Sequence, residues 1–258
     1  MKMKNKQAEE AREREEQRQE RKAKKAAQRS EEPSLARAPA SRAQRPVILI
    51  VREGKNTEKH YFEQFRLATH TFEFTGAGRN TKSLVREALK EKERKKYEQV
   101  WCVFDKDGFP LENFDNAIQQ AEAAGFKVGW SNQAFEYWLL LHFEDHQGGG
   151  LDRKEYTDKL NAHLEKLDAH YDGEGSKAIT SQLFNLLEGR DERGNLRREL
   201  AIKRAKRIHK AHLEAKTTPA RSESCTTVYE LVEEVQKFLP RLPHNPVPAA
   251  EKEDQEAA

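Results

Sequence analysis

Short apolar runs alternate with helical patterns through the middle of the chain. Val47-Ile-Leu-Ile-Val51 and Val100-Trp-Cys-Val-Phe104 are apolar without interruption, which is typical of strands covered on both faces. Phe126 to Trp130 predicts a third strand, and Thr71 to Thr75 a shorter one. Between them, apolar residues recur every three or four positions, which predicts helices. These helices are expected from about Thr57 to Leu67, Thr81 to Lys96, Asn113 to Ala124 and Ala134 to Phe143.

The alternation of strands and helices over short loops predicts an α/β fold with a mostly parallel sheet. Beyond Gly148 the pattern is helical, so residues 46–147 are expected to form the α/β core and residues 148–240 a mainly helical portion of the same domain. In that portion, helices are predicted at about 152–169, 176–188, 195–215 and 226–238.

The two ends of the chain differ from this middle part. Residues 1–45 contain 14 Lys and Arg against 8 Asp and Glu, a net charge of +6, so the rest of the chain carries −3 and the positive balance of the whole chain, +3, comes from this segment. Without an apolar stripe, this segment is expected to be a disordered or frayed-helical basic extension. Residues 241–258 are rich in Pro and acidic residues, and we expect a disordered acidic tail.

Composition excludes several classes of protein. The two cysteines, Cys102 and Cys225, are too few for a disulfide framework, which favours a reducing, cytoplasmic location. No apolar run approaches the roughly 18 residues that a membrane span needs. We therefore expect no membrane partner, and secreted, membrane and collagenous classes are excluded.

Acidic residues follow two of the predicted strands. Glu53 comes just after the first, and Asp105 and Asp107 come just after Val100 to Phe104. In an open parallel sheet, ligands bind at the carboxyl ends of the strands, and grouped carboxylates suit Mg²⁺ or Mn²⁺. The sequence thus predicts a metal site at Glu53, Asp105 and Asp107, with Glu53 as a ligand or a general acid/base. The alternative is that these acids only cap turns and remain solvated.

Two other kinds of site contain motifs similar to the one at Asp105 and Asp107. Phe104-Asp-Lys-Asp-Gly-Phe109 resembles the first motif of haloacid-dehalogenase-type phosphatases, but those proteins carry it on their first strand, and an earlier strand precedes it here. An EF-hand calcium loop is rejected because Gly108 comes too early in the motif.

Three ordered motifs together resemble the RloB family of bacterial abortive-infection proteins. They are Glu53-Gly-Lys-Asn-Thr-Glu-Lys-His-Tyr-Phe62, Val103-Phe-Asp-Lys-Asp-Gly-Phe109 and Ser131-Asn-Gln-Ala-Phe-Glu-Tyr-Trp-Leu-Leu-Leu-His-Phe143. The resemblance runs from about Pro46 to Leu239, and departs from the family at Gln133-Ala134 and Glu223-Ser224.

This resemblance implies a Toprim-like fold, the metal-binding domain of topoisomerases, primases and OLD-type nucleases. On it, Glu53 corresponds to the Toprim glutamate, and Asp105 and Asp107 to the Asp-x-Asp metal pair. The resemblance also implies a role in phage defence, often beside an AAA- or ABC-type ATPase encoded alongside.

The third motif contains further polar residues. Glu136 is a candidate catalytic residue, because a carboxylate at the start of an apolar helix could complete a second metal or phosphate position. It could equally be a first-turn carboxylate favoured by the helix dipole. Asn132 would share its helix face if the helix began early. His142 and His146 have a spacing that could hold zinc, but without a third ligand we expect them to be hydrogen-bonded structural residues.

Basic residues provide candidate contacts to nucleic acid, either DNA or RNA. Lys55 and Lys59 flank the acidic turn, and Arg204 and Arg207 belong to a basic segment from Leu196 to Lys216. Such a segment could follow a phosphate backbone, although charge runs are usually solvated faces.

The sequence therefore favours a Mg²⁺- or Mn²⁺-dependent phosphoryl-transfer protein, most simply a Toprim-type nuclease of phage defence. The alternative is a non-catalytic module that binds nucleic acid or an ATPase partner, in which the acids are structural.

Overall fold

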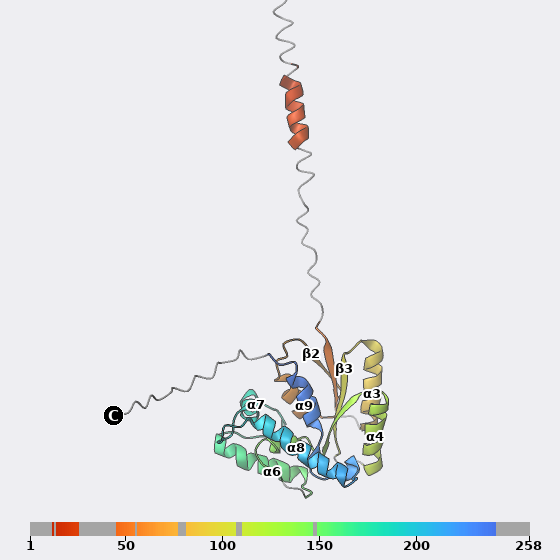
Figure 1. The fold of residues 1–258 in the computed structure, drawn as a ribbon, viewed down its shortest axis with the longest axis vertical. Coiled ribbons are helices and arrows are strands. Elements are labelled where there is room, and N and C mark those ends of the chain that lie inside the picture. The colour runs from red at the N-terminus through yellow and green to blue at the C-terminus, as the bar shows by residue number, and fades with distance from the viewer. Residues whose placement is uncertain are drawn as a thin grey trace, which may run out of the picture. The chain divides into compact units, whose positions relative to one another are not determined.

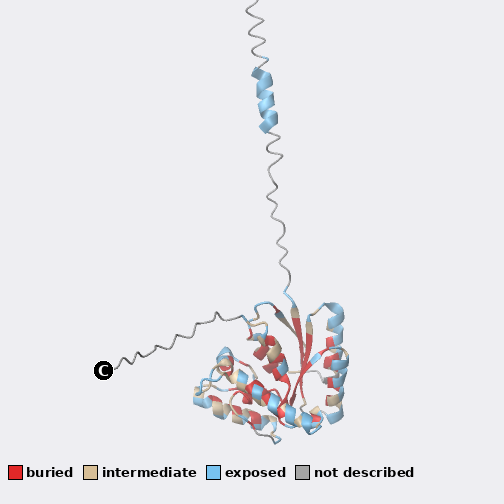
Figure 2. Cartoon of the chain, viewed as in Figure 1, coloured by how far each residue is buried: buried red, intermediate tan, exposed pale blue. Residues whose placement is uncertain are grey.

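The computed structural model describes residues 12, 14–25, 45–54, 56–76, 81–106, 110–146 and 149–240. The chain divides into two units, residues 1–44 and 45–258. In the first unit, residues 14–25 are helical and exposed, as the pale blue helix in Figure 2 shows. The predicted acidic tail, 241–258, lies outside the described residues.

The second unit is built on a five-stranded sheet with the order β2-β1-β3-β4-β5. Its first four strands are parallel, and β5 pairs antiparallel with β4. The strands are β1 (Val47–Arg52), β2 (Thr71–Thr75), β3 (Gln99–Asp105), β4 (Lys127–Asn132) and β5 (Cys225–Thr226). The predicted α/β fold with a mostly parallel sheet is confirmed.

Helices cover both faces of this sheet, with α3 and α4 on one side and α8 and α9 on the other (Figure 1). The helices of the α/β core are α2 (Thr57–Glu63), α3 (Thr81–Arg94), α4 (Leu111–Ala123) and α5 (Glu136–Leu140). Those of the helical portion are α6 (Arg153–Leu164), α7 (Ser181–Glu188), α8 (Arg197–Glu214) and α9 (Val228–Gln236).

The central strands β1 and β3 are buried on both faces, as their uninterrupted apolar sequences predict. Figure 2 shows this core in red between the two helical layers. Beside it, Tyr61 and Phe62 of α2 meet Phe135 edge-on, at ring-centroid distances of 5.6 and 6.3 Å. Edge-to-face contacts of this kind add to the stabilisation from apolar burial. They fix α2 and the start of α5 against each other.

Several predicted helix bounds are wrong, and the reasons are local. The helix expected from Ala134 to Phe143 is regular only over α5, and the one expected at 176–188 starts at Ser181, where the Thr180 hydroxyl caps it by accepting from Leu183 N at 3.2 Å. The helix expected at 152–169 ends at Leu164 and passes into a 3-10 turn, Glu165–Leu167.

The segment expected to start the last helix contains β5 instead. Thr226 pairs with Ser131, and its hydroxyl donates to Trp130 O at 3.0 Å. A two-residue strand is too short to produce an alternating pattern.

Among the described residues, no helix has the length and apolar character needed to cross a membrane.

Candidate active site

A pocket of about 290 Å³ opens beyond the carboxyl ends of β1 and β3. Ligands of open parallel sheets bind at this edge. It is lined by Gly54, Asn56, Thr57, Glu58, Asp105, Phe135, Glu136, Arg153, Gly175 and Lys177.

Three buried carboxylates, each at the end of an element, define the pocket. Asp105 is the last residue of β3, Glu136 is the first of α5, and Glu58 lies in the first turn of α2. Their exposed fractions are only 8%, 3% and 3%, respectively. Charged carboxylates are rarely buried without compensation, so the structure places an unusual concentration of negative charge here.

Burial and mutual repulsion raise the pKa of two of these carboxyl groups, those of Asp105 and Glu58. The pKa of Asp105 lies well above its ordinary value because the side chain is buried, and the nearby Glu58 and Glu136 raise it further, while Arg153 opposes them. The pKa of Glu58 is also raised, mainly by burial. Such perturbed carboxyl groups in a pocket mark a candidate functional site.

Gly54 makes room for Glu58. The Gly54 backbone N–H donates to Glu58 Oε1 at 3.2 Å, and a Cβ atom added at Gly54 would lie 2.1 Å from Glu58 Oε2. Only a residue without a side chain therefore allows the carboxylate to lie over this turn. The glycine that follows Glu53 thus allows the Glu58 carboxylate to lie close to the end of β1.

Arg153 provides a positive charge in contact with two of the acids. Its Nη2 donates to Asp105 Oδ2 at 3.0 Å, and its Nε lies 3.8 Å from Glu136 Oε2. Arg153 is the first residue of α6, which is fixed by a capping box in which the Asp152 side chain and the Glu155 side chain each accept from the other residue's backbone N–H. The helical portion thus contributes a cation to the sheet edge.

Tyr171 connects Glu136 to α2. Its hydroxyl donates to Glu136 Oε1 at 3.0 Å and lies 3.0 Å from Thr57 Oγ1. Tyr171 is fully buried, and burial together with Glu136 raises the pKa of its hydroxyl. A neutral hydroxyl is therefore kept as a hydrogen-bond donor that orients the Glu136 carboxylate.

The sequence-predicted acids are only partly brought together. Asp105 and Glu136 line the same pocket, whereas Asp107 lies outside the described residues. Glu53 directly follows β1, where its backbone N–H donates to Val103 O at 3.1 Å, and it is half-buried. It is not among the pocket-lining residues, whereas Glu58 is. Its catalytic and metal-binding roles stay a prediction.

The predicted nucleic-acid contacts lie elsewhere. Lys55 is outside the described residues, and Lys59 pairs with Glu63 on α2 at 3.4 Å. On α8, Arg204 Nη1 donates to Leu141 O at 2.7 Å. Arg207 Nη2 donates to Asp145 Oδ1 at 2.7 Å and to a backbone carbonyl at 3.0 Å. Both arginines hold the segment after α5, and their contact with nucleic acid stays a prediction.

The other polar residues of the third motif, and His146 just after it, form hydrogen bonds within the protein. His142 Nδ1 lies 2.9 Å from Trp138 O, and His146 Nδ1 lies 3.2 Å from the Tyr137 hydroxyl, as expected of hydrogen-bonded histidines. The helix does not begin early enough for Asn132 to share a face with Glu136, since α5 starts at Glu136 itself. Asn132 ends β4, and its side chain donates to the carbonyls of Pro219 and Ala220.

Sequence reasoning missed Glu58, Arg153 and Tyr171. The signal for Glu58 was its position one residue after Thr57, the start of a helix that follows a strand end. The Asp152-x-x-Glu155 spacing of a capping box predicts a helix start, and Arg153 is the first residue of that helix. No local signal pointed to Tyr171, which lies in a segment without regular structure.

The donor set fits a hard divalent cation by the chemistry of its oxygen atoms. Arg153 contacts Asp105 and Glu136, and the charge of Arg52 acts on Glu58. Lys177 also lines the pocket, so cations are present beside the acids. The carboxylate oxygens are the ligands that Mg²⁺ and Mn²⁺ prefer. Within the described ranges, no three His, Cys, Asp or Glu side chains are close enough together to bind one ion. Binding of one ion by all three carboxylates would therefore require these side chains to move closer together.

Comparison with known proteins gives one result. No curated protein and no solved structure matches the chain. The family model described as RloB-like protein matches residues 48–235, a range that covers the five strands except for Val47, the three carboxylates and Arg153. Since this match spans well over half of the chain, the protein belongs to the RloB-like protein family.

Proposed function

We propose that this protein catalyses metal-dependent phosphoryl transfer on nucleic acid, most simply as a nuclease, and that it acts in phage defence. The observation that carries the proposal is the convergence of Glu58, Asp105 and Glu136, all buried, on one pocket at the carboxyl edge of the parallel sheet. Purely structural acids are seldom gathered in this way, because their mutual repulsion must be offset.

Asp105, Glu58 and Glu136 would hold a Mg²⁺ or Mn²⁺ ion, together with Asp107 and Glu53 as predicted from the sequence. When bound, such an ion polarises a phosphoryl oxygen and lowers the pKa of bound water.

The protein's own groups supply the remaining functions. Glu58 has a raised pKa, so its carboxyl group can hold or accept a proton as a general acid or base. Arg153, released from Asp105, can bind a phosphate oxygen through its planar guanidinium. Lys177 lines the same pocket and adds positive charge. The Tyr171 hydroxyl fixes the orientation of Glu136.

The contact between Arg153 and Asp105 also favours a second candidate function. A permanent ion pair would make the acids structural, and the protein would then be a non-catalytic module that binds nucleic acid or an AAA- or ABC-type ATPase partner. The two functions differ in whether the acids are needed for turnover or for stability alone.

Cleavage assays distinguish them. The full chain is incubated with single- and double-stranded DNA and RNA, with Mg²⁺, with Mn²⁺ or with EDTA. The proposal expects cleavage that requires the metal and is lost in Asp105→Asn but retained in Asp158→Asn, an exposed acid on α6. Nucleic-acid binding without cleavage under any of these conditions, unchanged in Asp105→Asn, would favour the binding module.

A further inference from the structure

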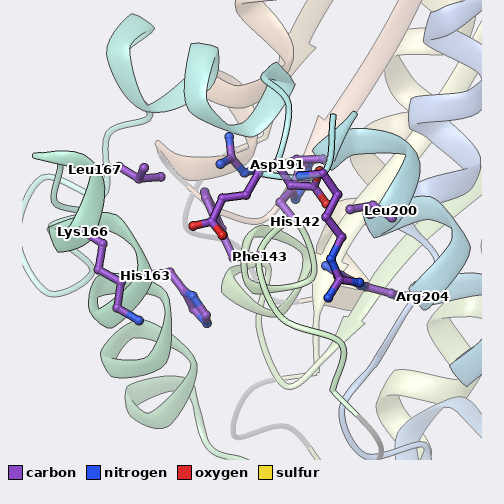
Figure 3. A pocket seen from close by; sticks show the side chains of 11 residues that line it. His142, Phe143, His163, Lys166, Leu167, Asp191, Leu200 and Arg204 are labelled. Carbon is purple, nitrogen blue, oxygen red and sulfur yellow. The ribbon is translucent and has the colours of Figure 1, made fainter. Parts of the chain in front are cut away.

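A second pocket, of about 240 Å³, lies at the other end of α5 (Figure 3). Its walls come from the turn after α5, the end of α6 with the following 3-10 turn, the loop 190–196 and the first turns of α8. None of the carboxylates of the candidate active site lines it.

Four cationic side chains line this second pocket: Lys166, Arg193, Arg197 and Arg204. Within the described part of the chain, none of them has a carboxylate within ion-pair distance. Arg197 and Arg204 donate instead to backbone carbonyls, of Leu186 at 3.1 Å and of Leu141 at 2.7 Å. Carbonyls fix these guanidinium groups without neutralising them, so positive charge is held in a defined place.

The two acids of the pocket, Asp191 and Glu192, offset only part of the charge of the four cations. Asp191 Oδ1 accepts from the backbone N–H groups of Arg193 and Asn195, at 2.9 and 2.8 Å, and these bonds lower the pKa of Asp191, with the Asn195 side chain as the largest cause. Asp191 thus shapes the loop that presents Arg193. Glu192 is exposed. The pocket keeps an excess of positive charge.

Helix α8 adds to the positive potential. It begins at Arg197, whose backbone N–H donates to Gly189 O at 2.9 Å, and its N-cap residue, Leu196, has no side-chain oxygen to accept from the N–H groups that follow. Such a helix start is a favourable position for an anion. Arg197 also lies over the ring of Phe143, 5.2 Å from its centroid, and this contact orients the guanidinium.

His142 provides a different kind of group. It is 1% exposed, and its Nδ1 must donate to the Trp138 carbonyl, which can only accept. Because burial lowers the pKa of His142 to about 3, the ring is neutral and Nε2 carries a lone pair. Nε2 is buried and has no hydrogen-bond partner in the described residues. A ligand with a hydroxyl or amino donor would satisfy it.

We propose that this second pocket binds a phosphate monoester on a sugar, as in a nucleotide. The four cations and the start of α8 would hold the phosphate, and His142 Nε2 would accept a hydrogen bond from a hydroxyl group. A free mononucleotide and the 5′-phosphorylated end of a nucleic acid share this chemistry. The proposal does not depend on the function of the carboxylate pocket.

Binding to the full chain tests it by calorimetry in EDTA, with AMP, adenosine and inorganic phosphate as probes. We expect AMP to bind more tightly than inorganic phosphate, and adenosine not to bind. Lys166→Ala combined with Arg193→Ala removes two exposed cations without disturbing packing, and should weaken AMP binding about 10-fold or more. Lys210→Ala, an exposed cation further along α8, is the matched control and should leave the affinity unchanged.

Three results would overturn the proposal: no binding of AMP, binding no tighter than that of inorganic phosphate, or an affinity unchanged in the double variant. Asp105→Asn should bind AMP normally, which separates this pocket from the carboxylate site. Oligonucleotides with a 5′-phosphate or a 5′-hydroxyl identify the source. Preference for the 5′-phosphate indicates a nucleic-acid end, and the absence of such a preference, with AMP bound, indicates a free nucleotide.

Discussion

Arg153 Nη2 donates to Asp105 Oδ2 at 3.0 Å, and this bond joins the first residue of α6 to the last residue of β3. The two residues come from the parts that the sequence separates into an α/β core and a helical portion. Without the helical portion, the acids at the sheet edge would lack their nearest compensating charge. The candidate active site is therefore a property of the whole domain.

Replacing Arg153 by Met should destabilise the protein at pH 7. Asp105 and Glu136 would remain buried without their counter-charge, which costs about 3–5 kcal/mol when a fully buried pair is broken. Since the Arg153 side chain is one-third exposed, we expect about 1–3 kcal/mol in the free energy of unfolding. Urea denaturation measures it. The control is Lys159→Met, on the same helix as Arg153. It breaks an ion pair with Glu144 and should cost less than about 1 kcal/mol.

The same variant should respond more strongly to Mg²⁺. Once Arg153 no longer contacts Asp105, a divalent cation can compensate the acids without competition. The rise in melting temperature on adding Mg²⁺ should therefore be larger in Arg153→Met than in the unmodified protein, and absent from Arg153→Met combined with Asp105→Asn. Equal responses in all three proteins would show that the ion binds elsewhere.

Glu58→Gln should lower metal-dependent cleavage by about 10- to 100-fold or more, because the change removes a carboxylate from the pocket while keeping its shape. Glu63→Gln, on the same helix with a side chain 42% exposed, is the matched control. Measuring the cleavage rate of Glu53→Gln in the same assay shows which of the two acids after β1, Glu53 or Glu58, contributes more to the reaction. Full activity in Glu58→Gln would exclude this residue from the reaction.

The parallel sheet could be predicted because burial on both faces leaves a direct trace in the sequence. The strands β1 and β3 consist almost entirely of apolar residues, and strand ends are where acids such as Asp105 can meet a ligand. The strand β5 left no trace of this kind. It pairs through two residues only, and Thr226 and Thr227 hydrogen-bond to β4 through their hydroxyls.

The residues of the site that the sequence did not predict are brought there by contacts over long sequence separations. Arg153 meets Asp105 across 48 residues, and Tyr171 meets Glu136 across 35. No periodicity connects such positions, since each depends on how the helical portion packs on the sheet. The basic character of α8 was visible, but not that Arg204 faces a pocket while it donates to the Leu141 carbonyl.

The buried His142 should make stability fall at acid pH. Its pKa is about 3 in the folded protein, against an ordinary value of 6.5, mainly because of burial and with Arg198 and Arg204 acting in the same direction. Between these two values the unfolded chain binds more protons, so stability is lost as the pH falls, by up to about 1.4 kcal/mol per pH unit. In His142→Gln this contribution is absent.

Urea denaturation at pH 7 and pH 5 measures the effect. The difference in unfolding free energy between the two pH values should be smaller in His142→Gln than in the unmodified protein. His170→Gln, an exposed histidine, is the control and should keep the original difference. An unchanged difference in His142→Gln would contradict the assignment of a neutral, buried ring.

Gly76→Ala should be more destabilising than Gly125→Ala, although the two glycines have almost the same backbone conformation, with φ of 74° and 76°. Both changes carry the cost of a side chain in the left-handed region, about 1–2 kcal/mol. At Gly125 a Cβ atom meets no described atom within 4 Å, whereas at Gly76 it would lie 2.6 Å from the backbone oxygen of Arg52. The difference between the two unfolding free energies, measured in urea, isolates the cost of that contact.

The same substitution should affect the response to Mg²⁺. Because Arg52 directly precedes Glu53, relief of the clash must move the backbone beside the carboxylate pocket. Gly76→Ala should therefore also weaken the response to Mg²⁺, while Gly125→Ala should preserve it. Equal destabilisation by the two substitutions would show that the turn at Gly76 yields without disturbing β1.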